Sequence, residues 1–287
     1  MENTEEVRNM AVKKTVTVDS AIYNITDKLQ GKGAKEYNCV QGYTISAGAN
    51  MVHFITARPN GKEDDVAVGH LLGQEMTVSK QRHLGHANDC AYYNSRYFIV
   101  EGGGTFSSTK IVELDNSLKH QGTYTYNAMK QSGKLDNITG IAHIKEQYFL
   151  LCEGQKLSVC ILNATKMTFD EKSRFSLSTN DLGQLSRSGC TRCGQGIYYA
   201  GGKLYKIFSY KSGTSIKQND IAEFSLSGSA PLFKRANLEY IYSCDRNSKV
   251  AFEIESLSSP NAGKTMYMLA NVKEGTEEAD RIYKISL

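Results

Sequence analysis

Apolar and polar residues follow one another along this chain in a pattern that is typical of short β-strands. Continuous apolar runs, rich in aromatic and β-branched side chains, recur at intervals of roughly 50 residues. These runs are Met51–Ile55, Tyr97–Val100, Tyr148–Cys152, Leu204–Phe208 and Met266–Leu269. Their apolar character predicts strands that are buried on both faces.

A second run follows each of these after a turn, and its polar and apolar residues alternate. The second runs are Asp65–Val68, Lys110–Leu114, Leu157–Ile161, Ile221–Leu226 and Arg281–Ile285. A period of two is expected of strands whose two faces have different surroundings. Fourth, outermost strands are predicted for the first four units, at Met76–Val78, Gly122–Tyr126, Arg174–Leu177 and Leu232–Lys234.

The repeat predicts an all-β fold, a single β-propeller of about five four-stranded blades over residues 1–287. The last unit lacks a fourth strand, because the sequence stops at Leu287, whereas Lys14–Val18 has a strand pattern without a unit. We therefore expect residues 14–18 to close the ring by completing the last blade, after a flexible N-terminus at residues 1–13. A β-sandwich and a parallel β-helix are the alternatives, although a β-helix would need shorter and more uniform coils.

Composition and charge exclude some classes of partner. The net charge of +4 is small and the basic residues are scattered, so nucleic acid is not indicated. No segment approaches the roughly 18 apolar residues that a membrane helix requires. The first residues lack the apolar segment of a secretion signal, which predicts a cytoplasmic protein, or an extracellular one if the chain has been trimmed. We expect a monomer.

The seven cysteines form an odd set, which favours reduced thiols over a disulfide framework. Cys190 and Cys193 have the spacing of a zinc or redox pair. A zinc site needs two further ligands, and the sequence contains no second pair of this kind. We therefore predict no metal and no cofactor, and a structural role for most of the cysteines.

The starts of the predicted units are the best candidates for function, since the first strand of each blade lines the central channel. A polar residue recurs there in each unit, with His86 at the rim of the resulting funnel. The candidate ligand-binding residues are Gln41, His86, Asn88, Asp89, Thr139, Gln195 and Glu253. The alternative interpretation is structural, because a small propeller needs polar groups in a hydrated channel whatever its function.

The segment Gly85–Asp89 is the most distinctive motif, because it places an imidazole, an amide and a carboxylate side by side. In an extended strand His86 and Asn88 would share a face, and Asp89 would point away from both. The three side chains can therefore converge only if a bulge or turn interrupts the strand. Asp89 could instead stabilise a turn by accepting backbone N–H bonds.

Two classes of function agree with this pattern. The first is a binding module that recognises a saccharide or a partner protein through its central funnel and rim loops. The second is a glycoside hydrolase or lyase that uses Asp89 with Glu253 or Glu255 as acid and base. Binding is favoured because few carboxylates recur at channel positions. The chain has no tryptophan, but tyrosines could stack on a sugar, among them Tyr43, Tyr92, Tyr93, Tyr198 and Tyr199.

The unit starts also suggest a family. Gln41-Gly42 at one start and Gly85-His86-Ala87-Asn88-Asp89 at the next, with aromatic inner strands, resemble the bacterial helveticin J-like five-bladed propellers over residues 36–287. This resemblance implies a bacterial or phage-linked protein with a role in bacteriocin action or cell-surface binding. It implies no established catalytic residues. The first residues lack a secretion signal, and this argues against the extracellular role that the resemblance implies.

Overall fold

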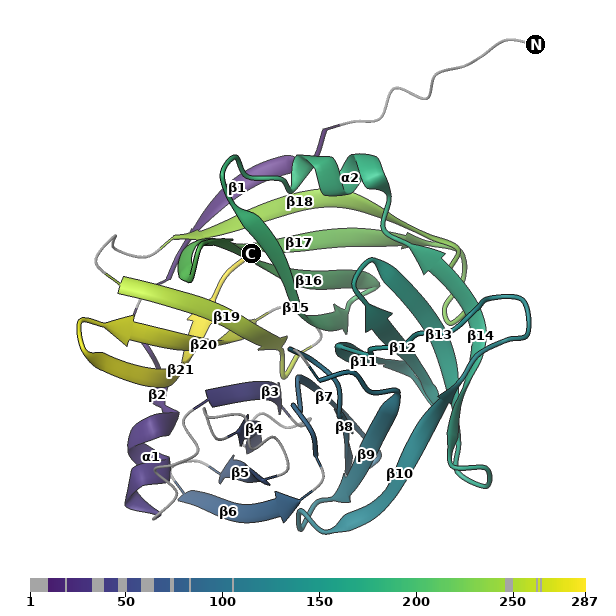
Figure 1. Ribbon diagram of the computed structural model, residues 1–287, viewed down its shortest axis with the longest axis horizontal. Coiled ribbons are helices and arrows are strands. Elements are labelled where there is room, and N and C mark those ends of the chain that lie inside the picture. The colour runs from purple at the N-terminus through teal and green to yellow at the C-terminus, as the bar shows by residue number, and fades with distance from the viewer. Residues whose placement is uncertain are drawn as a thin grey trace.

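The computed structural model describes residues 10–18, 20–32, 39–45, 51–57, 65–72, 75–82, 84–104, 106–245, 250–261, 263 and 265–287. The regular secondary structure of this part of the chain is almost entirely β-strand, with two short helices. The strands are grouped into antiparallel meanders, which are arranged around a common centre (Figure 1). The predicted all-β propeller is therefore confirmed.

The described strands form five meanders, numbered here from the N-terminal end. The first contains β3 (Cys39–Ile45), β4 (Met51–Ala57), β5 (Asp65–Leu72) and β6 (Glu75–Arg82). The second contains β7 (Asp89–Tyr93), β8 (Arg96–Val100), β9 (Lys110–Asp115) and β10 (His120–Asn127). The third contains β11 (Gly140–Lys145), β12 (Tyr148–Glu153), β13 (Lys156–Asn163) and β14 (Thr168–Ser176).

The fourth meander contains β15 (Thr191–Ala200), β16 (Lys203–Ser212), β17 (Ser215–Ser227) and β18 (Arg235–Asp245). The fifth contains β19 (Val250–Ser258), β20 (Met266–Glu274) and β21 (Glu277–Ile285), followed at its outer edge by β2 (Tyr23–Asn24). The innermost strands β3, β7, β11, β15 and β19 each contact the next, and β19 contacts β3. They form a closed ring of neighbours around the centre.

Each apolar run of the sequence is the second strand of a meander, and each alternating run is the third, as predicted. Three of the four predicted outermost strands overlap β6, β10 and β14. In the fourth meander the predicted segment 232–234 lies before β18, which begins only at Arg235. Phe233 is buried although it precedes the strand, so its apolar side chain marks packing and not the start of β18.

The last meander is completed by an N-terminal strand, but this strand is β2 and not residues 14–18. Residues 12–17 form β1 (Val12–Thr17), which pairs in parallel with β18, from Val12 opposite Tyr240 to Thr17 opposite Asp245. β2 then pairs with β21. The N-terminal segment thus connects the outer edges of the fourth and fifth meanders. Of the predicted flexible N-terminus, residues 1–9 lie outside the described residues and residues 12–13 belong to β1.

The core lies between the faces of neighbouring meanders. Phe98 and Phe149 pack between the second and third, with ring centroids 5.1 Å apart at 62°. Helix α1 (Ile25–Gly31) begins at Asn24, whose side chain accepts a hydrogen bond from the N–H of Asp27. It buries Ile25 and Leu29 against the first and fifth meanders. Helix α2 (Thr179–Gln184) precedes β15 and packs Leu182 into the cluster between the third and fourth.

Candidate functional site

Asp89, the first residue of β7, is buried where the five inner strands meet. Its Oδ2 accepts hydrogen bonds from the backbone N–H groups of Ile141 on β11, at 2.9 Å, and Ile197 on β15, at 3.1 Å. Its Oδ1 accepts one from the N–H of Cys90 at 2.9 Å, and one from the Ser256 hydroxyl on β19 at 3.4 Å. The Asp89 carboxylate therefore connects β7 by hydrogen bonds to β11, β15 and β19, which are far from it in the sequence.

Glycines make room for Asp89 on the neighbouring strands. A Cβ atom on Gly196 of β15 would lie 3.1 Å from the carboxylate, and one on Gly140 of β11 would lie 3.4 Å from its Oδ2. A Cβ on Gly42 of β3 would meet the backbone of Ala87 at 3.0 Å. A larger residue at these positions would push the inner strands apart.

Burial raises the pKa of Asp89 to about 7, although the three backbone N–H groups and the Lys206 ammonium act in the opposite direction. Lys206 is itself buried, and its Nζ lies 3.3 Å from the Sγ of Cys152. The centre of the ring thus holds an acid that titrates near neutral pH, in contact with backbone amides.

Asn88, the polar neighbour of Asp89 in the Gly85–Asp89 motif, is hydrogen-bonded to a partner other than Asp89. A turn at Gly85 and His86 interrupts the extended chain before β7. Asn88 donates from Nδ2 to the carbonyl oxygen of Thr139 at 2.6 Å. His86 is half-buried near Gly104, where an added Cβ would lie 3.0 Å from its ring. The motif therefore combines a turn with a central carboxylate.

Three further predicted residues, Gln195, Glu253 and Glu255, lie in a polar network on β15 and β19. Gln195 donates from Nε2 to Oε1 of Glu253 at 2.7 Å, and the Lys211 ammonium lies 2.8 Å from the same oxygen. Glu255 is buried and accepts a 2.7 Å hydrogen bond from Nδ2 of Asn271. Burial, with Glu253 as the next cause, raises the pKa of Glu255 well above its ordinary range. Gln41 is also buried.

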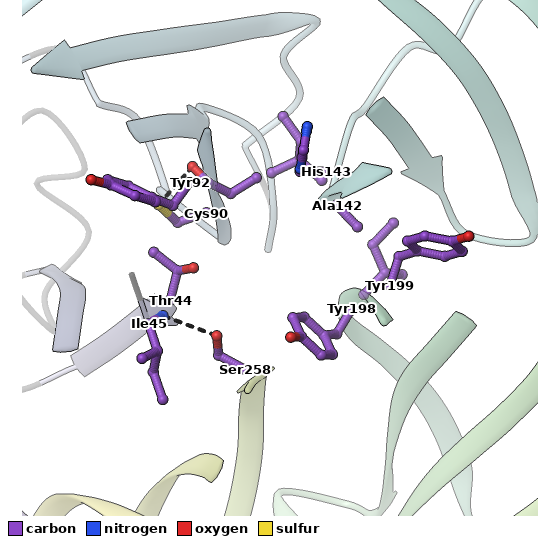
Figure 2. A pocket seen from close by; sticks show the side chains of 12 residues that line it. Thr44, Ile45, Cys90, Tyr92, Ala142, His143, Tyr198, Tyr199 and Ser258 are labelled. Atoms are coloured by element: carbon purple, nitrogen blue, oxygen red, sulfur yellow. Dashed lines mark hydrogen bonds between the residues drawn. The ribbon is translucent and has the colours of Figure 1, made fainter. Parts of the chain in front are cut away.

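A pocket of about 130 Å³ lies beside Asp89, at the end of the ring where the inner strands finish. We call it the axial pocket. Figure 2 shows its labelled side chains surrounding an open space. It is lined by Thr44, Ile45, Cys90, Ala91, Tyr92, Ile141, Ala142, His143, Ile197, Tyr198, Tyr199 and Ser258. Three of these, Cys90, Ile141 and Ile197, donate their backbone N–H groups to Asp89.

The polar groups of the axial pocket are neutral. Among the described residues that line it, none has an Asp, Glu, Lys or Arg side chain. Burial lowers the pKa of His143, whose ring stacks on Tyr93 with centroids 4.5 Å apart. Tyr198 donates its hydroxyl to the carbonyl of Ser259 at 3.1 Å, and Ser258 Oγ accepts from the N–H of Ile45 at 2.9 Å.

None of the seven predicted binding residues lines the axial pocket. The sequence predicts its tyrosines, Tyr92, Tyr198 and Tyr199, only as possible stacking residues for a sugar. The signal that points to them is positional, because the pairs Tyr92-Tyr93 and Tyr198-Tyr199 both stand near the ends of inner strands. Strand ends gather at the mouth of a propeller channel, so residues at equivalent strand ends can line one pocket.

The described part of the chain offers neither a cluster of metal ligands nor a membrane-crossing helix. There, no group of three or more His, Cys, Asp or Glu side chains is placed to hold a metal ion. Cys190 and Cys193 are half-buried free thiols. No helix within the described ranges is long and apolar enough to cross a membrane.

Comparison with known proteins places the fold. No protein-family model and no curated protein sequence matches the chain. A bifunctional GH43-CE protein from Bacteroides eggerthii is similar in structure, with a TM-score of 0.54 and 7% identity over 86% of this chain. The match covers 33% of that protein, so this chain spans about a third of its length.

Two further structures have a lower similarity. A calcium-binding regucalcin from Agrobacterium tumefaciens has a TM-score of 0.48 and 9% identity, over 96% of this chain and 97% of its own. A glycoside hydrolase has a TM-score of 0.48 and 10% identity, over 88% and 62% of the two chains. At these identities the similarity concerns the fold, which is that of a β-propeller.

Proposed function

We propose that this protein is a ligand-binding propeller, five-bladed as its five meanders suggest, and that its axial pocket accepts a neutral saccharide residue. The composition of the pocket carries this proposal. The Tyr198 ring offers an apolar face for the C–H groups of a sugar, while the Thr44 and Ser258 hydroxyls offer hydrogen bonds. The absence of charged side chains from its described lining favours a neutral ligand.

The test is direct binding to neutral sugars. Thermal-shift and calorimetric titrations with cellobiose, chitotriose and methyl α-mannoside should find saturable binding by at least one. Tyr198→Ala should weaken that binding by about two- to tenfold, because an aromatic contact contributes about 0.5 to 1.5 kcal/mol beyond its buried area. Tyr240→Ala is the matched control, since Tyr240 lies on the outer strand β18. Equal losses of affinity in both variants would contradict the proposal. The absence of saturable binding by any of the sugars would also contradict it, and would favour a protein partner.

A glycoside hydrolase or lyase is the second candidate, because an acid with a pKa of about 7, such as Asp89, suits general acid catalysis. The carboxylate oxygens of Asp89, however, already accept backbone N–H bonds. Oε1 of Glu253 likewise contacts Gln195 and Lys211, so neither carboxylate is free to contact a substrate without losing these partners. Product analysis of the sugar that binds distinguishes the two functions. Cleavage that is lost in both Asp89→Asn and Glu253→Gln would establish the enzyme.

Membership of the helveticin J-like family stays a prediction that rests on the Gln41-Gly42 and Gly85–Asp89 motifs. A bacterial source, a monomeric state and the cellular compartment likewise stay predictions. Size-exclusion chromatography with light scattering tests the monomer.

A further inference from the structure

The centre of the ring is filled at the level of Asp89. The Asp89 carboxylate accepts the N–H groups of Ile141 on β11 and Ile197 on β15, and its Oδ1 lies 3.4 Å from the Ser256 hydroxyl on β19. The same hydroxyl lies 3.2 Å from the carbonyl oxygen of Tyr43 on β3. Asp89 and Ser256 are each 1% exposed. All five inner strands are thus connected across the axis of the ring at this level.

Close contacts between the inner strands leave no passage through this level. A Cβ atom added to Gly42 of β3 would lie 3.1 Å from the backbone carbon of Asp89, and one added to Gly196 of β15 would lie 3.1 Å from its carboxylate carbon. A Cβ atom on Gly140 of β11 would lie 3.1 Å from a side-chain carbon of Ile197. The ring therefore has no room here for a further methyl group, and a ligand cannot thread from one end of the ring to the other.

The axial pocket lies directly on this closed level. Three of its lining residues donate their backbone N–H groups to Asp89 and are buried: Cys90, Ile141 and Ile197. The lining residues further along the same strands are half-buried, and they include Tyr92, His143 and Tyr199. Burial thus decreases along the strands away from Asp89, as expected of a pocket with a closed floor and a single mouth.

Walls surround the axial pocket, because each strand of the closed inner ring contributes to its lining. The contributing residues include Thr44 of β3, Tyr92 of β7, His143 of β11, Tyr198 of β15 and Ser258 of β19. Figure 2 shows these side chains around an open space. The volume of about 130 Å³ is well below the roughly 300 to 1,000 Å³ of pockets that enclose a drug-sized ligand. The axial pocket therefore suits one small ring and not an extended chain.

A sugar ring that enters such a pocket can be attached to only one neighbour. An internal residue of a linear saccharide has two glycosidic linkages, and both neighbours would have to leave through the same mouth. A terminal residue has one linkage, so its free end can lie against the floor while the rest of the chain stays outside. We propose that the axial pocket recognises the terminal residue of a neutral oligosaccharide and excludes internal residues, an inference that rests on the saccharide-binding function proposed above.

The length of the ligand provides the first test. Calorimetric titrations of the full chain compare cellobiose with cellohexaose, and chitotriose with chitohexaose. We expect the affinity per molecule to change by less than about twofold with length, since the added residues remain outside the pocket. Recognition of internal residues would instead increase the affinity for the hexasaccharide, because it offers more internal residues than the short chain does.

Modification of the two chain ends provides the second test and identifies the end that enters. Methylation of O4 alters the non-reducing end of cellobiose or chitotriose, and borohydride reduction opens the ring at the reducing end. We expect one of the two derivatives to bind about tenfold or more weakly than the parent sugar, because the closed floor leaves no room for an added methyl group or an opened ring. The other derivative is the matched control and should bind as the parent sugar does.

The outcomes separate this inference from the saccharide proposal. If both derivatives bind as tightly as the parent sugar, or if affinity increases with chain length, terminal recognition is overturned while saccharide binding stays established. The absence of saturable binding by all of these sugars would contradict the saccharide proposal itself. Tyr198→Ala should weaken the binding of short and long chains by the same factor, because both present one residue to the same pocket. Unchanged affinity of this variant for both would place the site elsewhere and overturn the assignment to the axial pocket.

Discussion

At the scale of single residues, Asp89 is subject to two opposing effects. Burial destabilises its ionised form, whereas the N–H groups of Cys90, Ile141 and Ile197 stabilise that form. Burial is the larger effect and raises the pKa from its ordinary value of 3.8 to about 7. When protonated, Asp89 can donate to the Ser256 hydroxyl, which in turn can donate to the carbonyl of Tyr43, 3.2 Å away.

The stability of the protein should therefore depend on pH through Asp89. The folded state holds the proton more tightly than the unfolded state, so the contribution of Asp89 is fully present below about pH 4 and is lost as pH rises through about 7. A shift of this size corresponds to at most about 4 kcal/mol. Urea unfolding of the unaltered protein and of Asp89→Asn, from pH 4 to pH 8, measures the difference.

Asp89→Asn cannot titrate, so the unaltered protein should lose stability relative to this variant over that range. Glu255 and Asp280, whose pKa values are also raised, contribute in the same direction in both proteins. Parallel pH profiles of the two proteins would show that Asp89 does not titrate as described.

At the scale of elements, the meander is the unit that the sequence reveals best. The apolar and alternating runs correspond to the second and third strands because these strands bury side chains in a regular pattern. The innermost strands are more irregular. β3, β11, β15 and β19 each contain a register shift next to their partner strand. Such bulges turn polar side chains toward the axis in a way that a period of two does not predict.

Gly42→Ala should destabilise the inner ring by about 1 to 3 kcal/mol, the usual cost of forcing an atom into a closely packed site. The added Cβ would lie 3.0 Å from the oxygen of Ala87 and 3.1 Å from the backbone carbon of Asp89, and neither atom can rotate away. Chemical denaturation gives the free energy of unfolding. In the control Gly183→Ala the new Cβ has no neighbour within 4 Å, so no loss is expected. Unchanged stability of Gly42→Ala would mean that β3 and β7 lie further apart.

At the scale of the whole molecule, the N-terminal segment connects the last meander of the chain to the first. β2 extends the fifth meander, and α1 then covers the junction between the fifth and first. Ile25 is fully buried there in one cluster with Val40, Leu269 and Ile282. Apolar contacts thus reinforce the short strand pairing of β2.

Ile25→Ala should lower the free energy of unfolding by about 2 to 5 kcal/mol, because it leaves a cavity at the junction of the ring. The control is Val12→Ala on β1, whose side chain is 51% exposed and whose removal should cost less than about 0.5 kcal/mol. Thermal and urea unfolding measure both variants. Comparable losses would contradict this prediction, because they would mean that β1 contributes as much to closing the ring as α1 does.

The sequence by itself determined the all-β class, the propeller and the positions of most strands, since these follow from local periodicity and its repetition. It also indicated that polar residues such as Asp89 and Glu253 begin the inner strands. Only the tertiary structure decided that the strand closing the last meander is β2, that Asp89 binds the amides of Ile141 and Ile197, and that Tyr198 lines the axial pocket. These contacts join residues far apart in the chain, and their geometry depends on bulges, close glycine approaches and packing between meanders, which no local pattern encodes.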